Sequence, residues 1–322
     1  MPLLSRRDVV ASAALAAALG VGAPVTLITP AQAQKTPPPA TPFRKFAVGT
    51  FECTAVYDGI WEKPHDPAFI KNASVDDVKR ALRAAGQTDE FVPIPFIPLV
   101  VSTGRDLVLF DAGTGGQVQP TAGTLLDNMK EAGLDPGKIT KIMISHFHPD
   151  HIFGLMEKGS NAALFPNAEI VVSTAEYKFW TDPAVIEKLP EARRPLAKRI
   201  QSTFPAWKNI RQVDGEMEVA PGIRSIATPG HTPGHIAFHI ASGGEQMIYS
   251  GDTFYQPALS LRTPHWHGSF DQDGPLAEKS RRALADRIVA DKVPVAGYHF
   301  PWPGAGVLEK DGSGYALTPA KG

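Results

Sequence analysis

The chain has 322 residues, of which 43% are hydrophobic and 20% charged, a composition that excludes a disordered chain. Its formal net charge is −1, and the sequence contains no long basic stripe, which argues against nucleic acid as the main partner. Cys53 is the only cysteine, so an internal disulfide and a thiolate metal cluster are excluded. We expect Cys53 to be a small buried side chain within a strand.

Residues 1–33 have the features of a twin-arginine signal peptide. Ser5-Arg6-Arg7-Asp8 precedes an apolar, alanine-rich stretch, and Ala31-Gln32-Ala33 offers a small-residue cleavage pattern. Glycine and proline interrupt the apolar stretch, which favours a cleaved signal over a stable membrane anchor. We therefore expect the twin-arginine export machinery as a partner during secretion and a periplasmic or secreted location. Residues 34–42 are proline-rich and predict an extended tether.

From Phe43 onward, segments with strand character alternate with helical segments. Two helices are predicted in the first half, at 75–85, with Ser74 as N-cap, and at 121–132, and a third starts at Ala175. Residues 183–207 are rich in Lys, Arg, Glu and Pro and are expected to pack outside the main sheets. The strands predicted in this half are 46–57, 91–101, 106–110, 139–145 and 168–173.

The second half repeats the strand pattern. Its one long predicted helix is 276–291, and its predicted strands are 223–228, 236–240, 246–250 and 293–297. No long linker separates the halves, so residues 43–322 are predicted to form a single domain. Strands and helices in both halves favour an α+β fold with two mixed sheets packed face to face and helices outside.

Three histidines and one aspartate lie within six positions, in the segment His146-Phe147-His148-Pro149-Asp150-His151. Neutral imidazole and ionised carboxylate groups are costly to bury without compensation. A cluster of four such side chains within six positions therefore requires an explanation. Because both groups bind zinc and other divalent ions, the segment is typical of a metal site.

Three further candidate ligands each follow a predicted strand: His231 in a Gly/Pro-rich turn, Asp252 after Gly251, and His299 after a short strand. Five histidines and two aspartates suffice for two metal ions, if each ion takes about three protein ligands and keeps an open position. The predicted ligands of one ion are His146, His148 and His231, those of the other are Asp150, His151 and His299, and Asp252 bridges both.

These motifs resemble those of the metallo-β-lactamase-fold hydrolases. The resemblance covers roughly residues 43–316 and rests on Asp111-Ala112-Gly113-Thr114-Gly115, the run 146–154, the turn 230–235, Gly251-Asp252 and His299. Within that superfamily, the chain looks most like the exported methyl parathion hydrolase and quorum-quenching lactonase group, to which residues 164–168 and 178–180 are also similar. The resemblance implies an αββα sandwich with a dinuclear site at one edge of the sheets, and a homodimer as the family habit.

The resemblance also implies that the protein hydrolyses a small-molecule substrate with a metal-bound hydroxide. Two divalent ions about 3.5–4 Å apart lower the pKa of a shared water and hold the developing oxyanion. Zinc is the expected metal, although manganese, cobalt and iron accept the same ligands. Asp150 would orient the hydroxide or take its proton, whereas Asp111 and His235 would support the site without binding metal.

Tyr255 indicates the substrate class. It lies three positions after Asp252, where the lactone-cleaving relatives carry a tyrosine whose hydroxyl binds the substrate carbonyl. We therefore predict a catalytic role for Tyr255 and a lactone or ester substrate. The role of His265 and His267 stays open. The residues predicted to form an apolar substrate pocket are Phe179, Trp180, Phe254, Trp266, Phe300 and Trp302.

Three alternatives remain. Phosphotriester hydrolysis is suggested by Phe179-Trp180, which resembles the aromatic wall of the organophosphate enzymes, although residues 117–119 lack the aromatic residue that lines their leaving-group pocket. A β-lactamase of the closest subclass would share the 146–151 motif but lack the bridging carboxylate of Asp252. A non-catalytic exported metal-binding protein would be favoured by a missing ligand, and none is missing.

Overall fold

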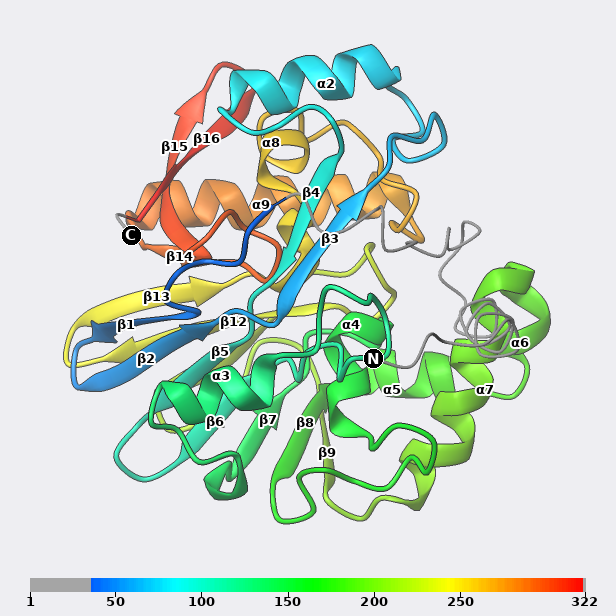
Figure 1. Cartoon of the computed structure of the whole chain (residues 1–322), viewed down its shortest axis with the longest axis vertical. Helices are drawn as coiled ribbons and strands as arrows, with labels where there is room; N and C mark the ends of the chain where they lie inside the picture. The colour runs from blue at the N-terminus through cyan, green and yellow to red at the C-terminus, as the bar shows by residue number, and fades with distance from the viewer. Residues whose placement is uncertain (1–35, 321–322) are drawn as a thin grey trace, which may run out of the picture.

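The computed structural model describes residues 36–320. The predicted signal peptide and the start of the predicted tether lie outside the described residues. The described chain forms two seven-stranded mixed sheets packed face to face, with helices on the outer faces (Figure 1). This architecture confirms the predicted αββα sandwich of the α+β class.

The first sheet has the strand order β1-β2-β5-β6-β7-β8-β9, in which β6 to β9 run parallel and the other neighbours pair antiparallel. Its strands are β1 (Phe43–Val48), β2 (Phe51–Val56), β5 (Leu99–Ser102), β6 (Leu107–Phe110), β7 (Lys141–Met143), β8 (Glu169–Ser173) and β9 (Ile210–Val213). The helices on its outer side are α3 (Leu125–Glu131), α4 (Pro149–Ile152), α5 (Thr174–Thr181), α6 (Val185–Lys188) and α7 (Arg194–Thr203).

The second sheet has the order β10 to β16, in which only β13 and β14 pair in parallel. Its strands are β10 (Glu218–Ala220), β11 (Ile223–Ala227), β12 (Ile236–Ser242), β13 (Glu245–Tyr249), β14 (Val295–Ala296), β15 (Ala305–Asp311) and β16 (Gly314–Pro319). The long helix α9 (Gly274–Asp291) packs on its outer face.

The remaining elements lie around the edges of the sandwich. They are the two-stranded antiparallel sheet of β3 (Gly59–Lys63) and β4 (Val92–Phe96), the helices α2 (Val75–Ala84) and α8 (Pro257–Ser260), and the 3₁₀ helices η2 (Pro136–Lys138), η3 (Phe153–Leu155), η4 (Glu191–Arg193), η5 (Phe204–Ala206) and η6 (Gly251–Phe254). Within residues 36–320, none of the helices combines the length and the apolar character that a membrane span requires.

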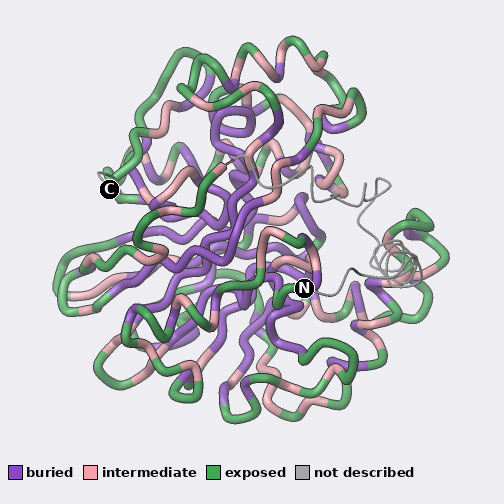
Figure 2. Tube along the Cα trace, viewed as in Figure 1, coloured by how far each residue is buried: buried purple, intermediate pink, exposed green. Residues whose placement is uncertain are grey.

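The central strands are buried on both faces, as the purple tube in the middle of Figure 2 shows. Phe110 and Met143 belong to the core between the two sheets, whereas Leu109 and Ile142 pack beneath the helices of the first sheet. This alternation follows from the two-residue period of a strand. Across the inner core, the rings of Phe110 and Phe238 lie 5.3 Å apart, so each sheet covers the apolar face of the other.

Several predicted boundaries are corrected by the structure. The strand predicted over 46–57 is a hairpin, because the chain turns at Gly49, where φ is 57° and a Cβ would lie 1.9 Å from the carbonyl oxygen of Ser242. The strand predicted over 91–101 is two strands, since the chain leaves β4 before Pro98. The helix after Ser74 is confirmed, and its Ser74 side chain accepts a hydrogen bond from the Asp77 backbone N–H.

Candidate metal centre and its cavity

The seven predicted ligands come from loops that follow strands of both sheets. His146 and His148 follow β7, and the short helix α4 carries Asp150 and His151. The second sheet supplies the other three, His231 after β11, Asp252 in η6 after β13, and His299 after β14. The register makes β11, β13 and β14 run in the same direction, so their carboxyl ends meet at one edge of the sheet.

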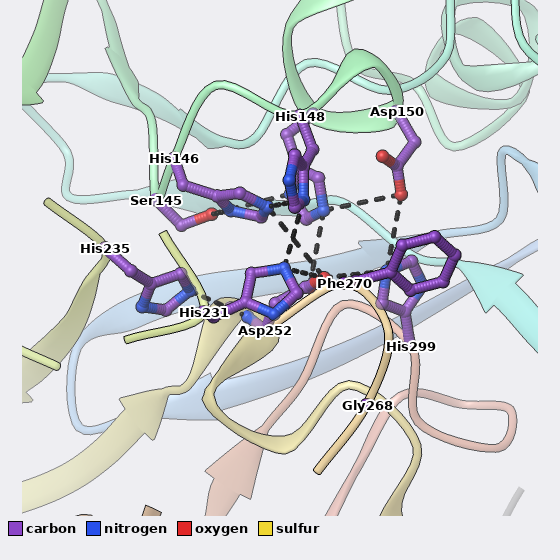
Figure 3. A network of polar contacts seen from close by, with 12 residues as sticks. Ser145, His146, His148, Asp150, His231, His235, Asp252, Gly268, Phe270 and His299 are labelled. Carbon is purple, nitrogen blue, oxygen red and sulfur yellow. Dashed lines mark hydrogen bonds and ion pairs between the residues drawn. The ribbon is translucent and has the colours of Figure 1, made fainter. Parts of the chain in front are cut away.

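The first group of ligand atoms contains three histidines and Asp252, all within 4.8 Å of one another. Nδ1 of His148 lies 2.9 Å from Nε2 of His146 and 3.0 Å from Nε2 of His231 (Figure 3). Oδ2 of Asp252 lies 3.3 Å from the same His231 nitrogen. Three ring nitrogens and a carboxylate oxygen that face one point form a donor set that suits a divalent ion.

The second group contains Asp150, His151 and His299, whose ligand atoms also lie within 4.8 Å of one another. Oδ2 of Asp150 lies 3.4 Å from Nε2 of His151 and 3.3 Å from Nε2 of His299. The remaining carboxylate, Asp252, lies between the two groups: Oδ1 is 3.3 Å from Nε2 of His151 and Oδ2 is 3.2 Å from Nε2 of His299. Asp252 is therefore placed where a bridging ligand would lie.

The hydrogen bonds on the outer side of the rings test whether these residues fit metal ions. Nδ1 of His151 donates to Asp111 at 2.9 Å, and Nδ1 of His299 donates to the carbonyl oxygen of Pro95 at 2.7 Å. With Nδ1 as the outer donor, each ring directs its Nε2 toward the centre, where a metal ion would take its lone pair in place of a proton. Among the described residues, the buried Nε2 of His151 and Oδ1 of Asp252 have no hydrogen-bond partner. Orphaned lone pairs of this kind fit a divalent cation.

The charges of the site favour a cation. Burial acts to lower the pKa of His299, but Asp252 and Asp150 outweigh it and raise that pKa to about 9. Burial acts to raise the pKa of Asp252, but positive charge on His299 and His151 holds it well below its usual range. The carboxylates that attract protons to these rings attract a metal ion for the same reason, so protons and metal compete for the same nitrogens.

Asp111 and His235 take supporting positions, as the sequence predicted. Asp111 accepts hydrogen bonds from Ser145 and from the hydroxyl of Tyr249, in addition to His151. His235 lies beside the site in Figure 3, where its Nε2 accepts from the backbone N–H of Asp252 at 3.0 Å. Because that nitrogen is already used, His235 orients Asp252 instead of binding metal.

Two buried carboxylates that the sequence did not single out hold the loops around the site. Asp58 accepts from the backbone N–H groups of Thr114 and Leu125, both at 2.8 Å. Glu176 accepts from the backbone N–H groups of Phe147 and Gly234, both at 2.9 Å, and thereby joins the first histidine loop to the loop of His231. Burial raises the pKa of each carboxyl, while these hydrogen bonds lower it.

A third overlooked carboxylate, Asp271, connects the metal centre to Tyr255 through a buried arginine. Asp271 lies 3.0 Å from Nδ1 of His231 and 3.1 Å from Nη2 of Arg281. The Arg281 guanidinium also lies 5.3 Å from the centre of the Tyr255 ring. No sequence pattern identified Asp271 or Arg281, because their partners are far away along the chain.

A cavity of about 660 Å³ opens onto the centre. Asp150, Asp252 and His299 form its floor, and Tyr255 lies on its wall with a buried hydroxyl that has no partner among the described residues. The lining residues that the sequence did not predict include Trp61, Ile94, Phe96, Val118, Leu189, Arg193, Leu196 and Phe270. An apolar cavity with a few polar groups is the usual form of a small-molecule site.

The predicted aromatic pocket needs correction, because Phe179 alone of its six residues lines this cavity. Phe254 and Phe300 are fully buried in the core between the second sheet and α9. Trp180 is fully buried behind His148, with the two ring centres 6.5 Å apart, and donates to Glu176. Two other tryptophans also pack elsewhere: Trp302 lies edge-on to Tyr57, and Trp266 packs against the inner core.

The segment between β8 and β9 contributes more than expected. Residues 183–207 do pack outside the sheets, but Lys188, Leu189, Arg193 and Leu196 also line the cavity. Nevertheless, the segment supplies none of the seven candidate ligands. His265 and His267, whose role the sequence left open, do not line the cavity. His265 is exposed, and Nε2 of His267 lies 3.1 Å from Oε2 of Glu278.

Curated relatives match about half of the chain. An N-acyl homoserine lactonase of Bacillus sp. is 32% identical over 165 residues, which cover 50% of this chain and 54% of the relative. A probable metallo-hydrolase of Mycobacterium tuberculosis is 26% identical over 180 residues, covering 49% of this chain and 56% of the relative. The matched region thus spans only about half the length of these relatives.

Solved structures match over a larger share. AidC, described as a dizinc quorum-quenching lactonase in complex with a homoserine product, has a TM-score of 0.81 at 28% identity, covering 87% of this chain and 97% of that one. The hydrolase AbOPH has a TM-score of 0.78 at 26% identity, with 87% and 98% coverage. Residues 98–297, more than half of the chain, match the sequence pattern of the Metallo-beta-lactamase superfamily. On this match and on the sandwich fold, the chain belongs to the metallo-β-lactamase superfamily.

Proposed function

We propose that the protein is a hydrolase that uses two divalent metal ions, with zinc expected, to cleave lactones or esters. The observation that carries the substrate class is Tyr255, which lines the same cavity as Asp252 and His299 and whose buried hydroxyl has no partner among the described residues. A buried hydroxyl without an acceptor is costly, and a substrate carbonyl would supply one. The lactonases among the relatives support the same substrate class.

The chain's own residues define the steps of the reaction. Metal ions at the two groups would polarise the scissile carbonyl and lower the pKa of water. Asp150, whose side chain is 18% exposed and lines the cavity, would accept a proton from the attacking water at a carboxylate oxygen. Tyr255 would donate its O–H to the oxygen that gains negative charge. Burial raises the pKa of Tyr255, so the hydroxyl keeps its proton at neutral pH.

Phosphotriester hydrolysis is the second candidate. The cavity wall carries the aromatic side chains of Trp61, Phe179 and Phe270, which would suit an aryl leaving group. Tyr255 favours lactone or ester hydrolysis, because its hydroxyl, unpartnered among the described residues, would donate a hydrogen bond to a substrate carbonyl oxygen.

A turnover screen tests the proposal. We expect metal-loaded protein to hydrolyse acyl lactones or aryl esters with a higher kcat/KM than phosphotriesters or a chromogenic β-lactam. A chelator should abolish the activity, and added zinc should restore it. Absence of turnover on all four classes would contradict the enzyme assignment, and would favour a metal-binding protein without catalysis.

Export by the twin-arginine pathway and a periplasmic or secreted location follow from residues 1–33 alone and stay predictions. Replacement of both arginines, as Arg6→Lys with Arg7→Lys, should retain the protein in the cytoplasm. Cell fractionation measures this, and unchanged export of the double variant would contradict it. Light scattering on the purified protein would test the expected homodimer.

A further inference from the structure

Three cationic side chains line the cavity: Lys71, Lys188 and Arg193. Within the described residues, Lys71 and Arg193 donate hydrogen bonds to backbone carbonyl oxygens and not to carboxylates. Lys188 and Lys71 are exposed, whereas Arg193 is half-buried, and its burial lowers its pKa while Asp271 raises it. A guanidinium stays charged under these conditions, so the cavity wall carries positive charge.

Lys71 and Arg193 converge on one turn of the chain. Nη2 of Arg193 donates to the carbonyl oxygen of Ser269 at 3.1 Å, and Nζ of Lys71 donates to that of Asp271 at 3.1 Å. Phe270, between these two residues, lines the cavity and lies beside the metal centre in Figure 3. Two cations from distant parts of the sequence therefore flank the same aromatic residue at the cavity wall.

Most of the acidic charge of the lining is engaged with groups other than these cations, although Asp271 raises the pKa of Arg193. Oδ2 of Asp150 and both oxygens of Asp252 face the ring nitrogens of the candidate ligands. Asp271 is paired with Arg281 and accepts from His231. Divalent ions at the centre would add further positive charge, so an uncharged substrate would leave the wall uncompensated, whereas an anionic group would be attracted to it.

We propose that the cavity binds a lactone or ester whose acyl part carries a second, anionic group, and that Arg193 and Lys71 bind this group. This inference rests on the proposed function and specifies its substrate. The apolar side chains of Leu189, Leu196 and Phe270 would enclose the carbon chain between the anionic group and the scissile bond. A carboxylate, a sulfonate and a phosphonate share the required charge.

Two esters of equal acyl length give the test: mono-para-nitrophenyl glutarate, which is anionic, and para-nitrophenyl pentanoate, which is neutral. We expect the wild-type protein to favour the anionic ester in kcat/KM by about tenfold or more, mainly through KM. Arg193→Gln and Lys71→Gln should each reduce that preference, because each should lower kcat/KM for the anionic ester more than for the neutral ester. Arg194→Gln, which removes an exposed arginine outside the cavity lining, is the matched control.

Further measurements test whether the preference for the anionic ester depends on the positive charge of Arg193. Arg193→Lys should retain part of the preference, because it keeps the charge, and added salt should reduce the preference of the wild-type protein. Sulfonate and phosphonate analogues of the anionic ester identify which anion is preferred. An unchanged ratio between the two esters in both glutamine variants, with melting temperatures like that of the wild type, would overturn the inference.

A binding measurement keeps this inference separate from the proposed function. Titration calorimetry with glutaryl para-nitroanilide and pentanoyl para-nitroanilide, whose amide bonds resist hydrolysis, reports the affinity for the anionic group without turnover. Arg193→Gln should weaken only the glutaryl ligand, by about tenfold. If neither lactones nor esters are hydrolysed but this difference appears, the proposed function fails and the anion site stands. Equal binding of both ligands by the wild-type protein would overturn the anion site.

Discussion

Oδ1 of Asp271 lies 3.0 Å from Nδ1 of His231, although 40 positions separate the two residues. His231 donates its Nδ1–H to this carboxylate, so its Nε2 keeps a lone pair directed toward His148 and Asp252. Arg281 holds the other oxygen of Asp271 at 3.1 Å. The orientation of His231 therefore depends on a buried ion pair that lies outside the candidate ligand set.

Asp271→Asn should weaken metal binding without removing a candidate ligand. An amide is a weaker acceptor for the His231 N–H and leaves Arg281 buried without its counter-charge. Affinity for zinc, measured by competition with a chromophoric chelator, should fall by about 10- to 100-fold. Asp214→Asn, an exposed carboxylate on a turn, is the control and should bind zinc normally. Normal zinc affinity in Asp271→Asn would contradict the supporting role.

Tyr255→Phe should lower kcat for lactones or esters by about 100-fold with little change in KM, because the hydroxyl acts on charge that develops during the reaction. Steady-state kinetics measure both constants. Tyr177→Phe removes a hydroxyl from a half-buried tyrosine outside the cavity and should leave kcat unchanged. If both variants turn over substrate like the wild type, Tyr255 has no part in stabilising the oxyanion.

His151→Ala should reduce the metal content from about two ions per chain to about one, because the second group would keep only Asp150, His299 and the shared Asp252. Elemental analysis of protein purified in excess zinc gives this number directly. His239→Ala, on a strand away from the centre, should keep the wild-type content. Two tightly bound ions in His151→Ala would refute the proposed division of ligands.

Glu176→Gln should destabilise the fold by about 2–4 kcal/mol, since an amide cannot accept from all the donors that Glu176 serves. These donors are the backbone N–H groups of Phe147 and Gly234 and the ring N–H of Trp180. Chemical denaturation measures the change, with the exposed Glu187→Gln as its control. A loss below about 0.5 kcal/mol would mean that water or another group replaces the carboxylate.

Cys53 should be inert in the folded protein. Its side chain is 1% exposed, and burial raises the pKa of its thiol to about 12. The reactive thiolate is therefore scarce at every pH up to that value, and its amount rises only as the pH approaches it. A thiol reagent at pH ~8 should label Cys53 in denaturant and not in buffer. Rapid labelling of the folded protein would show that this strand opens.

The seven candidate ligands predicted from the sequence do lie together in the structure, because residues able to bind metal are recognisable from residue type and local motif alone. Their role as metal ligands stays a prediction. The structure brings His146 and His231 within one donor set although their loops follow strands of different sheets. The supporting position of Asp111 was also predicted. Asp58, Glu176 and Asp271 were missed, because a carboxylate that accepts from backbone or ring N–H groups carries no local pattern.

The substrate cavity was predicted poorly, for a physical reason. An aromatic residue close in sequence to a ligand, such as Phe254 or Phe300, need not share its direction, and both turn toward α9. The true wall comes from β3, the turn around Phe270 and the helices after β8. Which side chains of these distant segments line the same cavity depends on how the segments pack in the folded protein.

The excursion between β8 and β9 contributes cavity wall but no candidate ligand. One part of the cavity wall is thus encoded in a stretch of the gene that is separate from the candidate ligands. Selection for a new substrate could change the cavity-lining residues of this segment, such as Lys188 and Arg193, while its buried core residues and the candidate ligands are kept. Chimaeras that exchange only this excursion between homologues should therefore transfer substrate preference, and they would do so without rebuilding the catalytic apparatus.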